Sequence, residues 1–206
     1  MASHEPPSGQ ISADEALRRL IDGNNRFLRG EVHLPSMPAE VAAEMVKGQR
    51  PYAMILGCAD SRVPPELVFG AGFGDLFVVR VAGTSMSPEV AGSFQYAALH
   101  LHTPLAVILG HEGCGAIAAA IEYKFRGTQQ ASRIQTLLEG LLPGLSGVDP
   151  HAGRDTQIAQ GVEANVRWNV ARILETPEGR TRMQEGRMKL VGAVYEIATG
   201  RVRFLQ

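Results

Sequence analysis

The stretch "PYAMILGCADSR", residues 51–62, determines how the rest of the chain is interpreted. Its first seven residues form a continuous apolar run that ends at a glycine, which predicts a strand buried on both faces of a sheet. A second run of this kind, "PLAVILG", occupies residues 104–110. Because strands covered on both faces are typical of parallel sheets, the two runs predict an α/β protein.

The segments around these strands alternate between extended and helical patterns. "LFVVRVAG" at 76–83 predicts a third strand, and "SADE" places Ser12 and Glu15 as a capping box that opens a helix over 12–28. Further helices are expected at 39–48, 88–101, 132–142 and 154–175 and in the alanine-rich segment after His111. The last segment, 189–206, alternates in polarity around a "TG" turn and predicts a β-hairpin.

The expected fold is therefore a mainly parallel, doubly wound sheet with helices on both faces, an N-terminal helical arm and a C-terminal β-hairpin. A length of 206 residues suits one domain over 12–206, preceded by a polar, proline-containing tail at 1–11 that we expect to be disordered.

Composition excludes several classes of function. The net charge is −1, from 20 basic and 21 acidic residues, and no basic run marks a surface for nucleic acid or anionic lipid. The apolar runs are too short to span a bilayer. The first residues, "MASHEPPSGQ", carry no secretory signal pattern, so we expect a cytoplasmic protein.

Potential metal ligands follow two of the predicted strands. Cys58 and Asp60 come directly after the strand at 51–57, and His111 and Cys114 follow the strand at 104–110. Because the carboxyl ends of neighbouring parallel strands line one crevice, these four side chains should converge. Two thiolates, an imidazole and a carboxylate suit tetrahedral zinc, so the sequence predicts a zinc site there.

Each of these signals has a simpler interpretation when taken alone. His-x-x-Cys and Cys-x-Asp are weak patterns, and Asp60 with Arg62 could form an ordinary loop salt bridge. Cys58 and Cys114 could also form a disulfide or a redox-active dithiol. Their combination at the ends of two matching strands, with every cysteine of the chain, favours the metal site. Arg80 lies inside a predicted strand and should need a partner, within the subunit or at a subunit contact.

Four segments of the chain resemble the β-class carbonic anhydrases, and the resemblance extends from about residue 12 to the end. They are "CADSR", "GDLFVVRVAG", "QYAALHL" and "GHEGCGA". The resemblance implies Zn2+ held by Cys58, His111 and Cys114, with Asp60 and Arg62 as a catalytic dyad. The implied reaction is the reversible hydration of carbon dioxide to bicarbonate and a proton through a zinc-bound hydroxide.

The resemblance also implies a homodimer or tetramer in which the helical arm at 12–48 packs on the partner subunit. Gln49 and Tyr96 match substrate-binding positions of the family, Gln49 acting across the dimer interface, and both favour an open resting site. In a closed state Asp60 would become the fourth zinc ligand. Hydrolysis of carbonyl sulfide or carbon disulfide with the same ligands stays an alternative activity, and a non-catalytic structural zinc protein is the alternative from another class.

Overall fold

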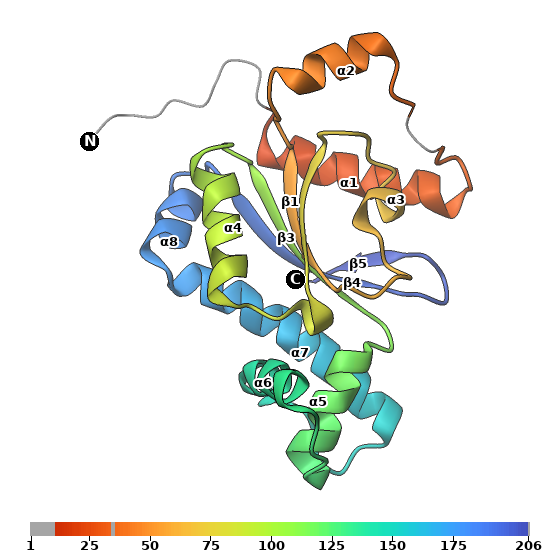
Figure 1. Ribbon diagram of the computed structural model, residues 1–206, viewed down its shortest axis with the longest axis vertical. Coiled ribbons are helices and arrows are strands. Elements are labelled where there is room, and N and C mark those ends of the chain that lie inside the picture. Colours follow the sequence, from red (N-terminus) through yellow and green to blue (C-terminus); the bar gives the residue numbers. More distant parts are fainter. Residues whose placement is uncertain (1–10, 34–35, 206) are drawn as a thin grey trace.

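A five-stranded sheet forms the centre of the computed structural model, which describes residues 11–33 and 36–205. The strand order is β2-β1-β3-β4-β5 (Figure 1). The strands are β1 (Ala53–Gly57), β2 (Leu76–Arg80), β3 (Leu105–His111), β4 (Lys189–Tyr195) and β5 (Val202–Phe204). β1 to β4 pair in parallel, and β5 pairs antiparallel with β4. The predicted α/β fold with a C-terminal β-hairpin is confirmed.

Helices cover both faces of this sheet. They are α1 (Ala13–Leu28), α2 (Ala39–Val46), α3 (Pro65–Val68), α4 (Pro88–Leu99), α5 (Gly115–Arg126), α6 (Ser132–Leu141), α7 (Arg154–Glu175) and α8 (Pro177–Gln184), with short 3-10 turns η1 (Ala82–Thr84) and η2 (Leu142–Leu145). Ile55 and Val107 face a core shared with α1, α3 and α5, whereas Leu56 and Ile108 face a second core shared with α4 and α7. This alternation explains why both strand runs are apolar throughout.

Local sequence signals account for most element boundaries. Ser12 caps α1 by accepting a hydrogen bond from the Glu15 N–H at 3.1 Å, as predicted, and Ser87 caps α4. The predicted strand at 76–83 is too long, because the chain leaves β2 after Arg80 and turns through η1, where Gly83 has φ 69°. The predicted helix at 88–101 likewise ends at Leu99. The short helices α3 and α8 were not predicted.

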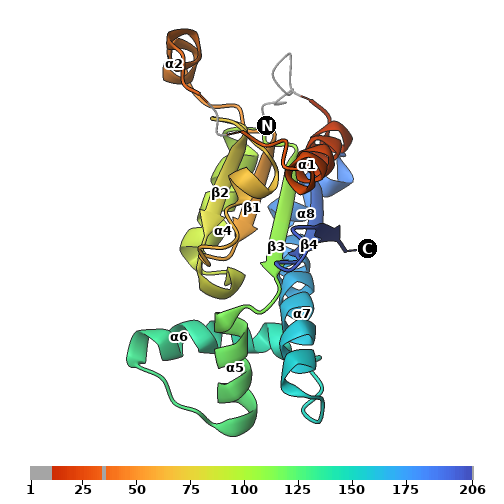
Figure 2. The ribbon, with the colours of Figure 1, turned by 90° about the vertical axis from the view of Figure 1, so that its right-hand side faces the viewer.

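The carboxyl ends of the parallel strands point toward a helical lobe made of α5, α6, η2 and the first turns of α7 (Figures 1 and 2). α7 continues from this lobe onto the sheet, where it packs very closely. A Cβ added at Gly110 would lie 2.7 Å from Val166 Cγ2, so only glycine permits this approach. α7 is therefore closely packed on β3 at this point.

The N-terminal helices behave differently from each other. α1 buries Ala16 and Leu20 against its own chain, whereas α2 buries no residue and stands away from the body (Figure 2). The tail predicted to be disordered, residues 1–11, lies outside the described residues except for Ile11. Among the described helices, none combines the length and apolar character needed to cross a bilayer.

Candidate metal centre

The pairing of β1 with β3 brings the predicted metal ligands together. Gly57 lies opposite Leu109, so Cys58 leaves β1 beside the end of β3, where His111 is the last residue. Cys114 occupies the N-cap position of α5. The two sulfur atoms lie 4.0 Å apart, and one ligand atom from each of the three residues lies within 4.8 Å of the others. All three side chains are buried.

His111 is prepared to act as a ligand. Its Nδ1 lies 2.8 Å from the carbonyl oxygen of Glu112, which can only accept, so Nδ1 carries the proton and Nε2 keeps its lone pair. Within the described part of the chain, this buried Nε2 has no hydrogen-bond partner. A buried polar atom without a partner is costly unless something absent from the coordinates satisfies it.

The spacing of these donors fits a tetrahedral metal ion. Zn–S bonds of about 2.3 Å at a tetrahedral angle place two sulfurs roughly 3.8 Å apart, close to the separation of Cys58 and Cys114. The donor set of two sulfurs and one imidazole nitrogen leaves a fourth position for another ligand. The three residues could therefore hold a metal ion without rearrangement of the backbone.

The two thiols differ in their electrostatic environment. The hydrogen bond between the two sulfurs lowers the pKa of Cys58, and the neighbouring His111 ring and the Gly83 N–H act in the same direction. The same contact with Cys58, together with burial, raises the pKa of Cys114, although the N–H groups at the start of α5 oppose this rise. The contact between the two sulfurs thus lowers the pKa of one thiol and raises that of the other, so it favours a pair with one thiolate and one thiol.

Asp60 and Arg62 form a two-pronged ion pair beside this cluster. Arg62 Nε and Nη2 donate to the two carboxylate oxygens of Asp60 at 2.9 and 2.8 Å, and the Arg62 N–H donates at 3.0 Å. These hydrogen bonds hold the pKa of Asp60 well below its ordinary value. Asp60 Oδ2 still lies only 3.9 Å from His111 Nε2, so the carboxylate borders the donor cluster while paired to Arg62.

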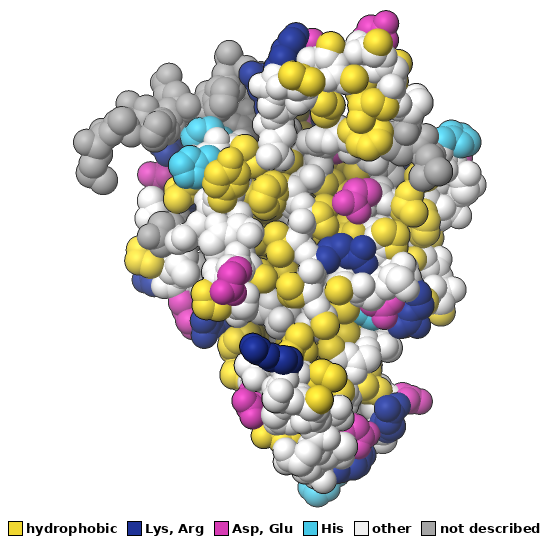
Figure 3. Space-filling view, in the orientation of Figure 1, with side chains coloured by type: hydrophobic (Ala, Val, Ile, Leu, Met, Phe, Trp, Pro, Cys, Tyr) yellow, Lys and Arg dark blue, Asp and Glu magenta, His cyan; other side chains and the backbone are white. Residues whose placement is uncertain are grey.

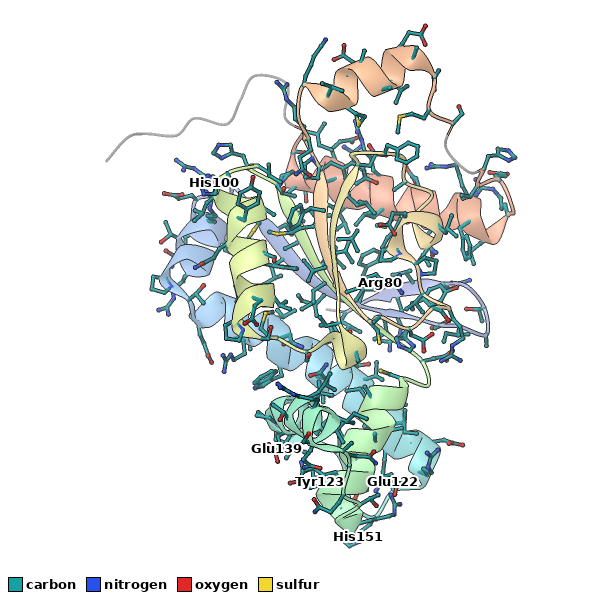
Figure 4. The ribbon with its side chains drawn as sticks, in the orientation of Figure 1. Arg80, His100, Glu122, Tyr123, Glu139 and His151 are labelled. Carbon is teal, nitrogen blue, oxygen red and sulfur yellow. The ribbon has the colours of Figure 1, made fainter. Side chains whose placement is uncertain are left out.

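Arg80, the charge inside the predicted strand, has its partners in the loop after β1. Its Nε donates to the carbonyl oxygen of Cys58 at 2.9 Å, and its Nη2 donates to that of Asp60 at 2.5 Å. Figure 4 shows Arg80 reaching from β2 toward the loop after β1. The partner is thus within the subunit, and Arg80 fixes the loop that carries a metal ligand. The only signal in the sequence was a charge inside an apolar strand.

Gln49 and Tyr96 lie apart from this cluster within one chain. Gln49 precedes β1 and is exposed, so it lies at the amino end of a strand whose carboxyl end leads to Cys58. Tyr96 is 48% exposed on α4, and its ring contacts Phe77 and His100. Phe77 lies near the start of β2, which places Tyr96 toward the same end of the sheet. The structure brings together five of the seven predicted site residues.

Comparison with known proteins identifies the family of this chain. Residues 53–202 match the family model described as carbonic anhydrase. The chain belongs to the carbonic anhydrase family. "Carbonic anhydrase 2" of Mycobacterium tuberculosis is 36% identical to it over 204 residues, which covers 95% of this chain and 93% of the relative. The carbonic anhydrase of Mycolicibacterium smegmatis is 36% identical over 205 residues, covering 96% and 94%.

Solved structures of β-carbonic anhydrases share the fold of this family member. The β-carbonic anhydrase CcaA superposes with a TM-score of 0.76 at 24% identity, covering 92% of this chain and 95% of CcaA. A tetrameric β-carbonic anhydrase of Sordaria macrospora gives a TM-score of 0.73 at 22% identity, covering 93% and 97%. Carbonic anhydrases are lyases, and the fold expected from the sequence is the one these enzymes have.

Proposed function

We propose that the protein catalyses the reversible hydration of carbon dioxide to bicarbonate and a proton at a zinc ion held by Cys58, His111 and Cys114. The observation that carries this proposal is the buried cluster of two thiols and an unpartnered imidazole nitrogen at the carboxyl ends of β1 and β3. Sulfur donors favour zinc over magnesium or calcium. When bound, zinc would act as a Lewis acid that lowers the pKa of a water molecule toward neutrality.

Asp60 is the residue that we expect to orient the reacting water. As a carboxylate it can only accept a hydrogen bond, so a water beside it presents a proton to Asp60 and directs an oxygen lone pair elsewhere. Attack of that oxygen on the carbon of carbon dioxide gives bicarbonate, and the proton passes to buffer. Asp60 is the catalytic residue, and Arg62 is the positioning residue that keeps it ionised.

The pairing of Asp60 with Arg62 supports an open resting site. Both carboxylate oxygens are engaged by the guanidinium, so the carboxylate is turned toward Arg62. A closed state would require Asp60 to exchange these charge-assisted hydrogen bonds for a metal bond. The same pair argues against the alternative of a purely structural zinc site, which has no use for a carboxylate held ionised beside it.

The remaining substrate contacts would come from a second copy of the chain. We assign Gln49 and Tyr96 to substrate binding across a subunit interface, since they lie at the opposite end of the sheet from Cys58 in their own subunit. β2 is an edge strand whose other side has no partner among the described residues, and all of its side chains are half-buried. Antiparallel placement of two copies along this edge would bring the two ends together.

The helical arm at 12–48 fits the same assembly, a homodimer or a tetramer. On α2, Met45 and Val46 are 37% and 89% exposed, and Figure 3 shows this apolar surface at the top of the view. Exposed apolar side chains on a helix that buries nothing suit a contact with a partner subunit. We further propose that residues 12–206 form a single domain. We also propose that the protein is cytoplasmic, where its two free cysteines would stay reduced.

Stopped-flow measurement of carbon dioxide hydration, with zinc content measured on the same sample, tests this function. We expect one zinc ion per chain and a rate of carbon dioxide hydration well above the uncatalysed rate in the same buffer. Bound zinc without hydration between pH 6.5 and 9 would point to the structural alternative. A parallel assay with carbonyl sulfide and carbon disulfide is needed, because a hydrolase of these substrates would use the same three metal ligands. Turnover of either compound in place of carbon dioxide would identify the alternative activity.

A further inference from the structure

Two buried asparagines on α7 lie behind the Cys58 side of the candidate metal centre. Asn165 and Asn169 are 2% and 0% exposed, and their spacing of four residues places them on one face of the helix. A buried amide must find hydrogen-bond partners, because its transfer out of water is unfavourable. The partners of these two side chains are therefore informative.

Both amides hold the backbone of η1. Asn165 Nδ2 donates to the carbonyl oxygen of Gly83 at 2.9 Å, and Asn169 Nδ2 donates to the carbonyl oxygen of Thr84 at 3.0 Å. Asn169 Nδ2 also lies 3.0 Å from the backbone oxygen of Asn165. Two consecutive carbonyl groups are thus anchored to a helix that follows them by about 80 residues.

The anchored residues have an unusual backbone conformation. Gly83 has φ 69° and Thr84 has φ 56°, both in the left-handed region. That region is unfavourable for a β-branched residue such as Thr84, so the conformation persists only where the surroundings impose it. Thr84 Oγ1 contributes a hydrogen bond to the carbonyl oxygen of Leu109 at 3.3 Å. Asn165 and Asn169 add the two hydrogen bonds from α7 to the carbonyl oxygens of Gly83 and Thr84.

This conformation directs one donor at a metal ligand. The Gly83 N–H lies 3.3 Å from Cys58 Sγ. A side chain would not fit at this position, because a Cβ added at Gly83 would lie 2.8 Å from Leu141 Cδ1 and 3.1 Å from Ala116 Cβ. Hydrogen bonds to ligand atoms from the surrounding protein orient the ligands and adjust metal affinity.

We propose that Asn165 and Asn169 are positioning residues for the metal centre. They hold η1 so that the Gly83 N–H donates to the Cys58 thiolate while it binds the metal, and they touch neither metal nor substrate themselves. The inference rests on the proposed zinc centre. It predicts that these amides govern metal affinity and the metal–sulfur bond in addition to the stability of the fold.

The test compares Asn165→Ala with the control Asn24→Ala. Asn24 is also a buried amide on a helix, but it donates to the carbonyl oxygens of Val68 and Gly200 and accepts from the Val202 N–H. Each metal-free protein is titrated with zinc against a chromophoric chelator, and the thiolate-to-metal charge-transfer band is recorded with cobalt. Thermal unfolding gives the loss of stability in each variant.

We expect Asn165→Ala to weaken zinc binding by about 10- to 100-fold and to shift the cobalt band, the range typical for residues that support metal ligands. Asn24→Ala should destabilise the fold and leave zinc affinity and the cobalt band unchanged. Unchanged affinity in Asn165→Ala, or an equal loss in both variants, would overturn the inference. Absence of a thiolate band in the unmutated protein would instead overturn the proposed zinc centre.

A second measurement needs no mutation and applies even if Asn165→Ala does not fold. With cadmium-113 in the site, NMR should detect scalar coupling between the metal and the Gly83 amide proton, transmitted through the N–H···S hydrogen bond. Coupling to the Cys58 Hβ protons serves as the internal control. If the Hβ coupling is present and the Gly83 coupling is absent, the inference is wrong.

Discussion

Arg80 donates a hydrogen bond from Nε to the carbonyl oxygen of Cys58 at 2.9 Å, so the edge strand β2 fixes the backbone of the first candidate metal ligand. Its Nη2 holds the carbonyl oxygen of Asp60 in the same way. One guanidinium thereby sets the positions of a sulfur ligand and of the proposed catalytic carboxylate. Figure 4 shows that Arg80 enters this loop from the β2 side.

Replacing Arg80 should destabilise the protein even without metal. Arg80→Leu removes both charge-assisted hydrogen bonds and leaves two carbonyl groups without their donors. We expect the free energy of unfolding of the metal-free protein to fall by about 2–3 kcal/mol, measured by urea denaturation. Arg203→Leu is the control, because Arg203 pairs with Glu163 at the surface, and it should cost less than about 1 kcal/mol. Equal losses would show that Arg80 has no special role.

Asp60 should be required for turnover but not for metal binding. Asp60→Asn is close in shape but replaces one acceptor oxygen with a donor, so it no longer orients the water as a carboxylate does. We expect the hydration rate to fall by about 100-fold or more at unchanged zinc content, in line with the usual contribution of a positioned acid–base group. A stopped-flow assay measures the hydration rate, and elemental analysis of the same preparation measures the zinc content. A variant with full activity would remove Asp60 from the mechanism.

His111 should be needed for zinc retention. His111→Ala removes the only nitrogen donor of the cluster and leaves two thiols, which should reduce the zinc content after dialysis well below one per chain. His151→Ala is a suitable control, because that histidine is exposed in a loop between η2 and α7. Zinc bound equally by both variants would contradict the assigned ligand set.

The ion pair between α7 and β5 gives a prediction about pH. Hydrogen bonds from Arg167 and Arg203 lower the pKa of Glu163 below its ordinary value of 4.5. Because the folded-state pKa is lowered, the stabilisation is fully present above about pH 4.5 and is lost as the pH falls through the lowered value. Glu163→Gln should therefore cost up to about 1 kcal/mol at pH 7 and progressively less toward pH 3.

Urea denaturation of the unmutated chain and Glu163→Gln across that pH range measures the difference. Glu40→Gln provides the control, since the exposed Glu40 makes no ion pair with any described residue, and its difference should be small at every pH. If the difference in the free energy of unfolding between the unmutated chain and Glu163→Gln grew as the pH fell, the pKa of Glu163 would be raised on folding.

The exposed face of α2 should control assembly. Val46→Glu places a charge on a side chain that is 89% exposed in the single chain, so it should leave the subunit folded. If α2 packs on a partner, the variant should dissociate to smaller species in light scattering. Ile134→Glu on α6, at a side chain that is 49% exposed, is the matched control and should leave the oligomer intact. Identical masses for all three proteins would exclude α2 from the interface.

Short-range patterns in the sequence predict much of the fold and of the candidate metal centre. The apolar runs predicted β1 and β3, and their shared ending predicted that Cys58, His111 and Cys114 would meet, since the two strands are neighbours. Such patterns do not predict where β2 ends. "VVRVAG" is apolar enough to continue a strand, and the contacts that hold it as η1 come from distant residues on α7, β3 and the loop after β1.

The buried asparagines were missed for the same physical reason. Asn165 and Asn169 lie in an otherwise regular helix, and their partners are carbonyl groups about 80 residues earlier, which no local pattern reveals. Arg80 was noticed because a charge among apolar residues conflicts with its surroundings. Buried amides create no such conflict. Long-range hydrogen bonds of uncharged side chains are thus the part of the site that the sequence conceals.

The anchoring of η1 by α7 also has a consequence for synthesis of the chain. Cys58, His111 and Cys114 leave the ribosome well before Asn165 and Asn169, and β4 follows later still, although it flanks β3 along its whole length. A nascent chain can therefore present all three ligands before it can hold the donor for Cys58 in place. We therefore expect tight metal binding in the native geometry only after the C-terminal third has been synthesised. Until then no metal protects Cys58 and Cys114, whose sulfurs lie 4.0 Å apart in the folded chain, from oxidation.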